Sequence, residues 1–156
     1  MQDFIEKIEK AEQDSYRRWS RMPNRDVYAE VDLSAISHNV KRIKDRIRNQ
    51  KKMCAVVKAN AYGHGAVAVA REAIAAGADY LAVAILNEAI ELRQAGFKEP
   101  ILILGFTPER QACQLVEYDI EQAVFTVEAA KALSEAALRQ GKKAKVHIKV
   151  DTGMSR

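Results

Sequence analysis

Residues 55–65 of the chain read AVVKANAYGHG. An unbroken apolar run leads directly into Lys58, and Gly63 and Gly65 then stand on either side of a histidine. This order is typical of a buried strand that ends at a lysine and continues into a loop. In barrels of alternating strands and helices, the functional side chains lie at the C-terminal ends of the strands. The segment therefore predicts a strand that places the Lys58 ammonium group at that edge.

A lysine at such a position has two possible uses. Its aliphatic stem can lie on an apolar wall while its ammonium group stays in water, which is the common structural case. Alternatively, neighbouring groups desolvate the amine and make it a nucleophile toward carbonyl compounds. The position of Lys58 alone leaves both uses open.

The rest of the chain predicts alternating strands and helices. Strands are expected at residues 53–58, 80–85, 101–104, 122–125 and 144–150, and helices at residues 66–76, 87–95, 108–117 and 127–140. Continuous apolar strands between amphipathic helices are typical of a parallel sheet that is buried on both faces. We expect an α/β fold of the (β/α)8 TIM-barrel type with only about the first five strands present, because a closed barrel needs eight strands and about 250 residues.

The residues before this pattern predict a separate N-terminal segment. Apolar residues recur on one side of an expected helix over residues 3–21, which Pro23 ends. A short strand at residues 27–31 and a helix capped by Asp32 follow. The predicted organisation is a helical extension, residues 1–26, and the N-terminal portion of a barrel domain, residues 27–156.

Composition and charge exclude several classes of protein. With 48% hydrophobic residues among 156, the chain has an ordinary globular composition. Residues 1–52 hold 13 Lys and Arg against 9 Asp and Glu and so supply the whole net charge of +4, but their mixed signs indicate a solvated helix face rather than a nucleic-acid-binding tail. No apolar run approaches the roughly 20 residues that span a bilayer. Cys54 and Cys113 do not have metal-ligand spacing. We expect a cytoplasmic protein without nucleic-acid, membrane or metal partners.

The segment VVKANAYGHG, residues 56–65, resembles the signature of the alanine racemase family. Residues 29–40, AEVDLSAISHNV, resemble the opening of the same family, and residues 83–93 resemble a later strand and helix. The resemblance implies that Lys58 is catalytic and holds pyridoxal 5′-phosphate covalently, and that Tyr62 binds the cofactor phosphate. It also implies that Leu104 lines the cofactor pocket. For His64 we favour a structural position before the next helix over a catalytic role.

Residues 147–156 resemble a second signature of this family, HxKxDTGMxR. By this resemblance Arg156 contacts the cofactor phenolate and the substrate, and Lys149 is carbamylated. Two cations that point into one barrel repel, whereas a carbamate on Lys149 would hold Arg156 by charge-assisted hydrogen bonds. The alternative is an ordinary lysine at the edge of the barrel and a terminal arginine without a role.

The resemblance implies an alanine racemase that interconverts L- and D-alanine and supplies D-alanine for peptidoglycan. Family members are homodimers, and their second base is a tyrosine that the C-terminal domain of the partner subunit contributes. We therefore expect these 156 residues to be the N-terminal part of a longer polypeptide and to be inactive alone. Two alternatives stay open: a serine or broad-specificity racemase, and a barrel protein that binds pyridoxal 5′-phosphate without catalysis.

Overall fold

A computed structural model of the chain describes residues 29–48 and 51–155. Residues 32–156 form one compact unit, separate from a unit of residues 1–31. The expected helix over residues 3–21, and with it the extension 1–26, lies outside the described residues. All helices and strands described below belong to the larger unit.

The larger unit is built on one parallel sheet of five strands in the order β1-β2-β3-β4-β5. The strands are β1 (Cys54–Val56), β2 (Tyr80–Val83), β3 (Ile101–Ile103), β4 (Glu121–Val124) and β5 (Val146–Ile148). Each strand pairs in parallel with the next one along the chain. Sequential parallel pairing is the topology of an α/β barrel, and the prediction of a partial barrel with five strands is confirmed.

The strands expected at residues 80–85, 101–104, 122–125 and 144–150 are present with shifted or shorter ends, and two further expected strands differ more from the structure. Residues 29–31, the described part of the expected strand 27–31, are not in a strand, because the sheet begins at β1 and Asp32 already caps the helix that follows. The strand expected at residues 53–58 ends at Val56, because the backbone turns at Lys58 instead of continuing along β2.

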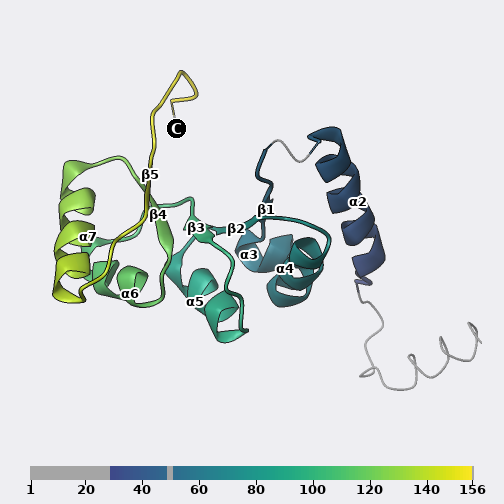
Figure 1. Ribbon diagram of the computed structural model, residues 1–156, viewed down its shortest axis with the longest axis horizontal. Coiled ribbons are helices and arrows are strands. Elements are labelled where there is room, and N and C mark those ends of the chain that lie inside the picture. The colour runs from purple at the N-terminus through teal and green to yellow at the C-terminus, as the bar shows by residue number, and fades with distance from the viewer. Residues whose placement is uncertain (1–28, 49–50, 156) are drawn as a thin grey trace, which may run out of the picture. The chain divides into compact units, whose positions relative to one another are not determined.

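One helix precedes β1, and the others connect consecutive strands. They are α2 (Leu33–Arg46), α3 (Lys58–Tyr62), α4 (Ala66–Ala75), α5 (Leu86–Gln94), α6 (Ala112–Glu117) and α7 (Val127–Arg139), with a 3-10 turn η1 (Glu109–Gln111) before α6. Figure 1 shows α4, α5, α6 and α7 following one another along the sheet in the order of the strands they connect. Asp32 caps α2 as predicted: its Oδ1 accepts hydrogen bonds from Ser34 N at 2.8 Å and Ala35 N at 3.2 Å. Among the described residues, no helix is long and apolar enough to cross a membrane.

The core lies between the sheet and the helices that follow its strands. Alternate strand residues point into it and are almost completely buried: Val57, Leu81, Val83, Ile101 and Ile103. The residues between them face the opposite, concave side of the sheet, which is the inside of the partial barrel. This side is partly open, and Leu104 there is 39% exposed.

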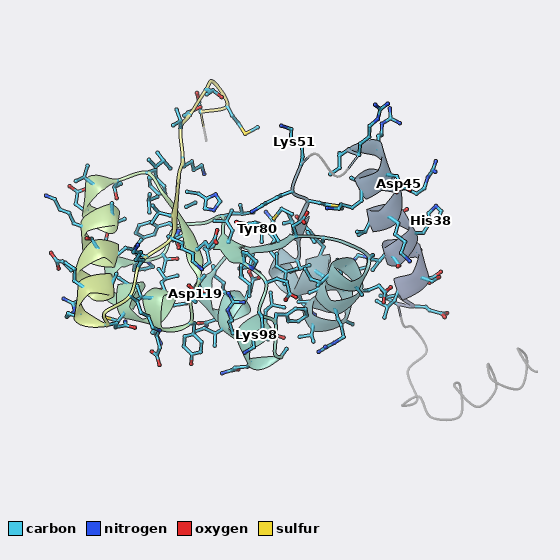
Figure 2. All side chains as sticks on the ribbon, in the orientation of Figure 1. His38, Asp45, Lys51, Tyr80, Lys98 and Asp119 are labelled. Carbon is cyan, nitrogen blue, oxygen red and sulfur yellow. The ribbon has the colours of Figure 1, made fainter. Side chains whose placement is uncertain are left out.

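The N-terminal ends of the strands carry contacts that hold elements together. Arg93 on α5 donates to the carbonyl oxygens of Tyr118 at 3.0 Å and Asp119 at 2.9 Å in the segment that leads into β4. Asp119, which is labelled in Figure 2, also pairs with Lys145 Nζ at 3.0 Å. Burial lowers the pKa of Arg93, against the opposing effect of Asp119. In this fold such an end of the barrel serves stability, so the chemistry is sought at the other end.

Candidate functional site

The C-terminal ends of the strands surround a concavity of about 560 Å³. Lys58, Leu104 and Lys149 all line it, together with Ala84, Leu102, Gly105, Ala123, His147 and Ile148. A second hollow of about 740 Å³ shares Leu104, Gly105 and Lys149 and extends to residues 150–154. Both volumes lie within the roughly 300–1,000 Å³ usual for small-molecule sites. The structure therefore brings three of the five predicted site residues, which lie just after β1, β3 and β5, to one surface.

The other two predicted site residues are Tyr62 and Arg156. Tyr62 does not line the concavity; it is 61% exposed, and its ring centroid lies 6.0 Å from Lys58 Nζ. Arg156 lies outside the described residues. His64 is exposed, and its Nδ1 lies 2.8 Å from Ala61 O just before α4, which fits the structural position expected for it.

The backbone after Lys58 turns in the left-handed sense. Ala59, Asn60, Ala61 and Tyr62 have φ values of 51° to 56°, although none of them is glycine. An L-residue in this conformation costs roughly 1–2 kcal/mol, because its Cβ crowds the following carbonyl oxygen. Four such residues in succession persist only where the surroundings hold them, and turns of this kind are frequent at functional sites.

Hydrogen bonds from several directions hold the turn. Ala61 N donates to Val57 O at 2.9 Å, and Gly65 N donates to Asn60 O at 2.9 Å. The Asn60 side chain accepts from Ala66 N at 2.7 Å and so caps α4 from within the turn. Ala59 N donates to Glu88 Oε1 at 2.6 Å, a contact between residues far apart in sequence. The turn is therefore fixed at both ends and in the middle.

Close backbone packing joins the end of β2 to the end of β3. A Cβ added to Gly105 would lie 2.4 Å from Ala84 O, far inside normal contact distance. Gly105 O in turn accepts from Gln122 Nε2 at 2.8 Å, and Thr107 Oγ1 donates to Gln122 Oε1 at 2.6 Å. Gln122 is 3% exposed, so a buried amide of β4 positions the loop that carries Leu104.

A second polar pair lies on β4 and β5. Glu121 is 5% exposed, and its Oε2 lies 2.7 Å from His147 Nε2, whose ring also lines the concavity. The register Ala123↔His147 sets these side chains on the concave side of the sheet. Sequence reasoning did not single out Glu121, Gln122 or Glu88, although a glutamate at the third position of a helix that follows a strand is a signal that could have marked Glu88.

The segment after β5 is organised by Asp151. Its Oδ1 accepts from Gly153 N at 2.9 Å and from Ser155 N at 3.0 Å. These bonds, with Ser155 N the larger effect, hold the pKa of Asp151 below its usual value. The segment that resembles a cofactor-binding signature therefore forms an ordered turn as far as Ser155.

Chemically, the concavity offers a primary amine, apolar walls and a second lysine. These groups suit an aromatic carbonyl compound that forms a covalent bond to an amine. Within residues 29–48 and 51–155, no group of three or more His, Cys, Asp or Glu side chains is arranged to hold a metal ion.

Known proteins resemble this chain over most of its length. A family model described as the N-terminal domain of alanine racemase matches residues 31–156. An alanine racemase of Clostridium perfringens (strain ATCC 13124) is 54% identical over 132 residues, which are 85% of this chain and 34% of that protein. The solved alanine racemase of Clostridium difficile 630 has a TM-score of 0.82 at 41% identity, over 86% of this chain and 36% of that one.

A racemase with a different named substrate is also similar. The solved histidine racemase from Leuconostoc mesenteroides subsp. sake has a TM-score of 0.77 at 40% identity, over 86% of this chain and 36% of that one. The chain thus spans about a third of the length of the relatives that it matches. Since the family model covers residues 31–156 and the fold agrees with solved members, the chain belongs to the alanine racemase family, whose N-terminal domain it matches.

Proposed function

We propose that this chain supplies the cofactor-binding lysine of a pyridoxal 5′-phosphate-dependent alanine racemase. The observation that carries the proposal is the meeting of Lys58, Leu104 and Lys149 around one concavity at the C-terminal ends of the strands. The membership of the chain in the family supports the same activity. The relatives are about two and a half times as long as this chain, so the proposal concerns its share of the reaction.

The residues present fit the cofactor. An aldehyde-bearing cofactor needs a primary amine, and Lys58 offers one on the wall of the concavity. Leu102, Leu104 and Ala84 form an apolar wall on which a pyridine ring can lie. Tyr62 is the last residue of the turn, and its side chain is exposed, so its hydroxyl is available to a phosphate group. When bound, pyridoxal 5′-phosphate accepts the electron pair left at the substrate Cα once its proton is removed.

Lys58 has two tasks in this proposal. Its Nζ would hold the cofactor through the aldehyde group, and the same amine would be free while the substrate occupies the site. The freed amine lies beside the substrate and takes or returns the Cα proton on one face. Racemisation also needs a group on the opposite face, and we propose that the tyrosine of a second subunit provides it, in a homodimer.

Lys149 and Arg156 form the second part of the site in this proposal. Lys149 lines both hollows, and it follows β5 on the same wall as His147. A carbamate on Lys149 would replace a positive charge with a negative one and hold Arg156 for contact with the cofactor phenolate and the substrate. Lys149→Ala should lower activity, and small carboxylates should partly restore it. Unchanged turnover by Lys149→Ala would contradict this role.

The cellular setting follows the activity. We propose a cytoplasmic enzyme that supplies D-alanine for peptidoglycan and acts without nucleic-acid, membrane or metal partners. Residues 1–26 are proposed to be a helical extension ahead of the barrel portion 27–156.

A racemase of another specificity is the second candidate. The histidine racemase resembles this chain nearly as well as the alanine racemases do, so the part of the fold present here is compatible with different substrates. Serine and broad-range racemases are compatible in the same way. A barrel that binds the cofactor without catalysis is the third candidate.

A chimera separates these candidates. Residues 31–156 would replace the matching segment of the Clostridium perfringens alanine racemase, to which they are 54% identical. We expect the chimera to form D-alanine and to support growth of a strain that requires D-alanine, and its Lys58→Ala version to do neither. A chimera that binds the cofactor but racemises no amino acid would contradict the proposal. Faster turnover of serine or histidine than of alanine would favour the second candidate.

A further inference from the structure

We propose that Glu88 is the positioning residue of Lys58. Its carboxylate accepts hydrogen bonds both from the peptide group that follows Lys58 and from the end of the neighbouring strand. By linking the two, it fixes the direction of the lysine side chain. The inference rests on the proposed function in one respect, namely that Lys58 is the reactive lysine.

The carboxylate of Glu88 makes contacts in two directions. Oε2 accepts from Ala84 N at 2.7 Å and from Ile85 N at 3.3 Å, at the start of α5. Oε1 accepts from Ala59 N at 2.6 Å. The last ladder bond between these strands runs from Val57 N to Ala82 O at 2.8 Å. Beyond it, within the part of the chain that the structure describes, the hydrogen bonds that connect the two segments run from their Ala59 and Ala84 N–H groups to this carboxylate.

Helix capping accounts for only half of this arrangement. A glutamate at the third position of a helix often accepts from the backbone N–H of the capping residue, which here is Ile85. Ile85 has no side-chain acceptor with which to return the bond. The contact to Ala59 spans 29 residues and lies outside α5, so the start of the helix does not require it.

The bond to Ala59 acts on the strained part of the backbone. Ala59 is the first of the four left-handed residues, with φ 51° and ψ 50°. Its N–H belongs to the peptide plane that begins at the Lys58 carbonyl carbon. Fixing this plane sets the ψ angle of Lys58 and the direction in which its side chain leaves the backbone. An ionised carboxylate suits this task, because it offers acceptors only and can receive all three N–H groups.

Conservative substitutions of Glu88 show whether its charge, its length or only its size is needed to hold the turn. Glu88→Gln keeps the size but replaces one acceptor oxygen with a donor, which would face an N–H group. Glu88→Asp keeps the charge but is one methylene too short to reach both strand ends. Glu91→Gln is the matched control, since Glu91 is exposed on the same helix.

The test uses the 156-residue chain with pyridoxal 5′-phosphate as the probe. Borohydride traps the covalent adduct at increasing times, and peptide mapping gives the labelling rate of Lys58 relative to exposed Lys98 in the same digest. Amide hydrogen exchange of Ala59 is measured in parallel. We expect Glu88→Gln to slow labelling of Lys58 about tenfold to a hundredfold, as for a misplaced reacting group. It should speed exchange at Ala59 and leave Lys98 unchanged. Glu88→Asp should give an intermediate effect, and Glu91→Gln none.

The two measurements distinguish the possible failures. Wild-type labelling of Lys58 no faster than that of Lys98 would overturn the proposed function, and Ala59 exchange would still decide the contact of Glu88. Unchanged Ala59 exchange in Glu88→Gln overturns the inference. Unchanged Lys58 labelling in that variant also overturns it, because Glu88 would then hold the turn without directing the lysine.

Discussion

The buried carboxylate of Glu121 depends on one histidine. Its Oε2 lies 2.7 Å from His147 Nε2, and the glutamate side chain is 7% exposed. Removing the partner leaves a buried acceptor unsatisfied, which typically costs about 1–3 kcal/mol. We predict that His147→Ala lowers the free energy of unfolding by about that amount in urea titrations.

The control for this change is His38→Ala, since His38 is exposed on α2 and exposed positions usually change stability by less than about 0.5 kcal/mol. Equal urea midpoints for the two variants would show that Glu121 does not need its partner.

Gly105 is a second position where a single added atom would change stability. An added Cβ would meet Ala84 O at 2.4 Å, and both partners of the clash are backbone. Overpacking of this kind typically costs about 1–3 kcal/mol. We predict that Gly105→Ala lowers the stability of the chain by about this amount in urea titrations. A midpoint equal to that of the wild type would mean that β2 and β3 move apart without cost.

Some of these residues could be predicted from the sequence, and others could not. The positions of Lys58 and Lys149 at the C-terminal edge of the sheet could be predicted, because each comes soon after an apolar strand in a recognisable motif. Glu88, Glu121 and Gln122 could not, because their roles come from partners on other strands that meet only in the folded chain.

The attachment of α2 to the sheet depends on Asp79, just before β2. Its Oδ2 accepts from Lys44 Nζ at 2.8 Å and from Met53 N at 2.7 Å. The hydrogen bond from Lys44 is the main reason that the pKa of Asp79 lies below its usual value of 3.8. A lowered carboxyl pKa contributes stability above the unfolded value, and this stability is lost as the pH falls through the folded value.

We therefore predict that stability declines below about pH 3.8 in part through Asp79. Asp79→Asn should lower the urea midpoint at pH 5 to 7 and should reduce the difference between pH 5 and pH 2. The measurement is a series of urea titrations across this range. An identical pH dependence for the two proteins would rule out Asp79 as a contributor.

The last strand presents an uncovered surface. In β5, Ile148 is 80% exposed and Val146 is 42% exposed, and no further strand pairs with β5 among the described residues. Exposed apolar edge strands promote pairing between molecules, and a lysine on such an edge opposes it. We predict that the chain self-associates with rising concentration and that Ile148→Lys reduces this, as seen by sedimentation velocity. The control is Leu138→Lys, since Leu138 is 78% exposed but belongs to helix α7 and not to the edge strand. Equal reduction by both variants would show that the edge is not involved.

The helices and strands could be predicted where one clear pattern of apolar residues marks them. The five strands of the sheet follow mainly from continuous apolar runs, and the longer helices follow from helical spacing of apolar residues. The left-handed turn at Lys58–Tyr62 was not predicted, because its residues have no intrinsic preference for positive φ. Hydrogen bonds from its N–H groups to the Glu88 carboxylate and to Val57 O impose it. The strand at residues 27–31 was wrong in its described part, since extended sequence forms a strand only beside a partner.

In the proposed function, the chain as a whole supplies one side of a reaction centre. Lys58 and Lys149 line the concavity just after β1 and β5, two strands of the sheet that packs on the core, while α4, α5, α6 and α7 carry no predicted site residue. A single lysine base serves one face of the substrate, and loss of a positioned acid or base typically costs about 10²- to 10⁴-fold. The contribution of this chain that can be tested by itself is therefore the reactive lysine.

The decisive measurement is the site of covalent attachment. The chain is incubated with pyridoxal 5′-phosphate, reduced with borohydride, digested and mapped by mass spectrometry. We predict that the pyridoxyl group lies predominantly on Lys58, because the turn supported by Glu88 presents its amine at the wall of the concavity. Predominant labelling of another lysine, including Lys149 in the same concavity, would contradict the assignment of Lys58 as the cofactor lysine.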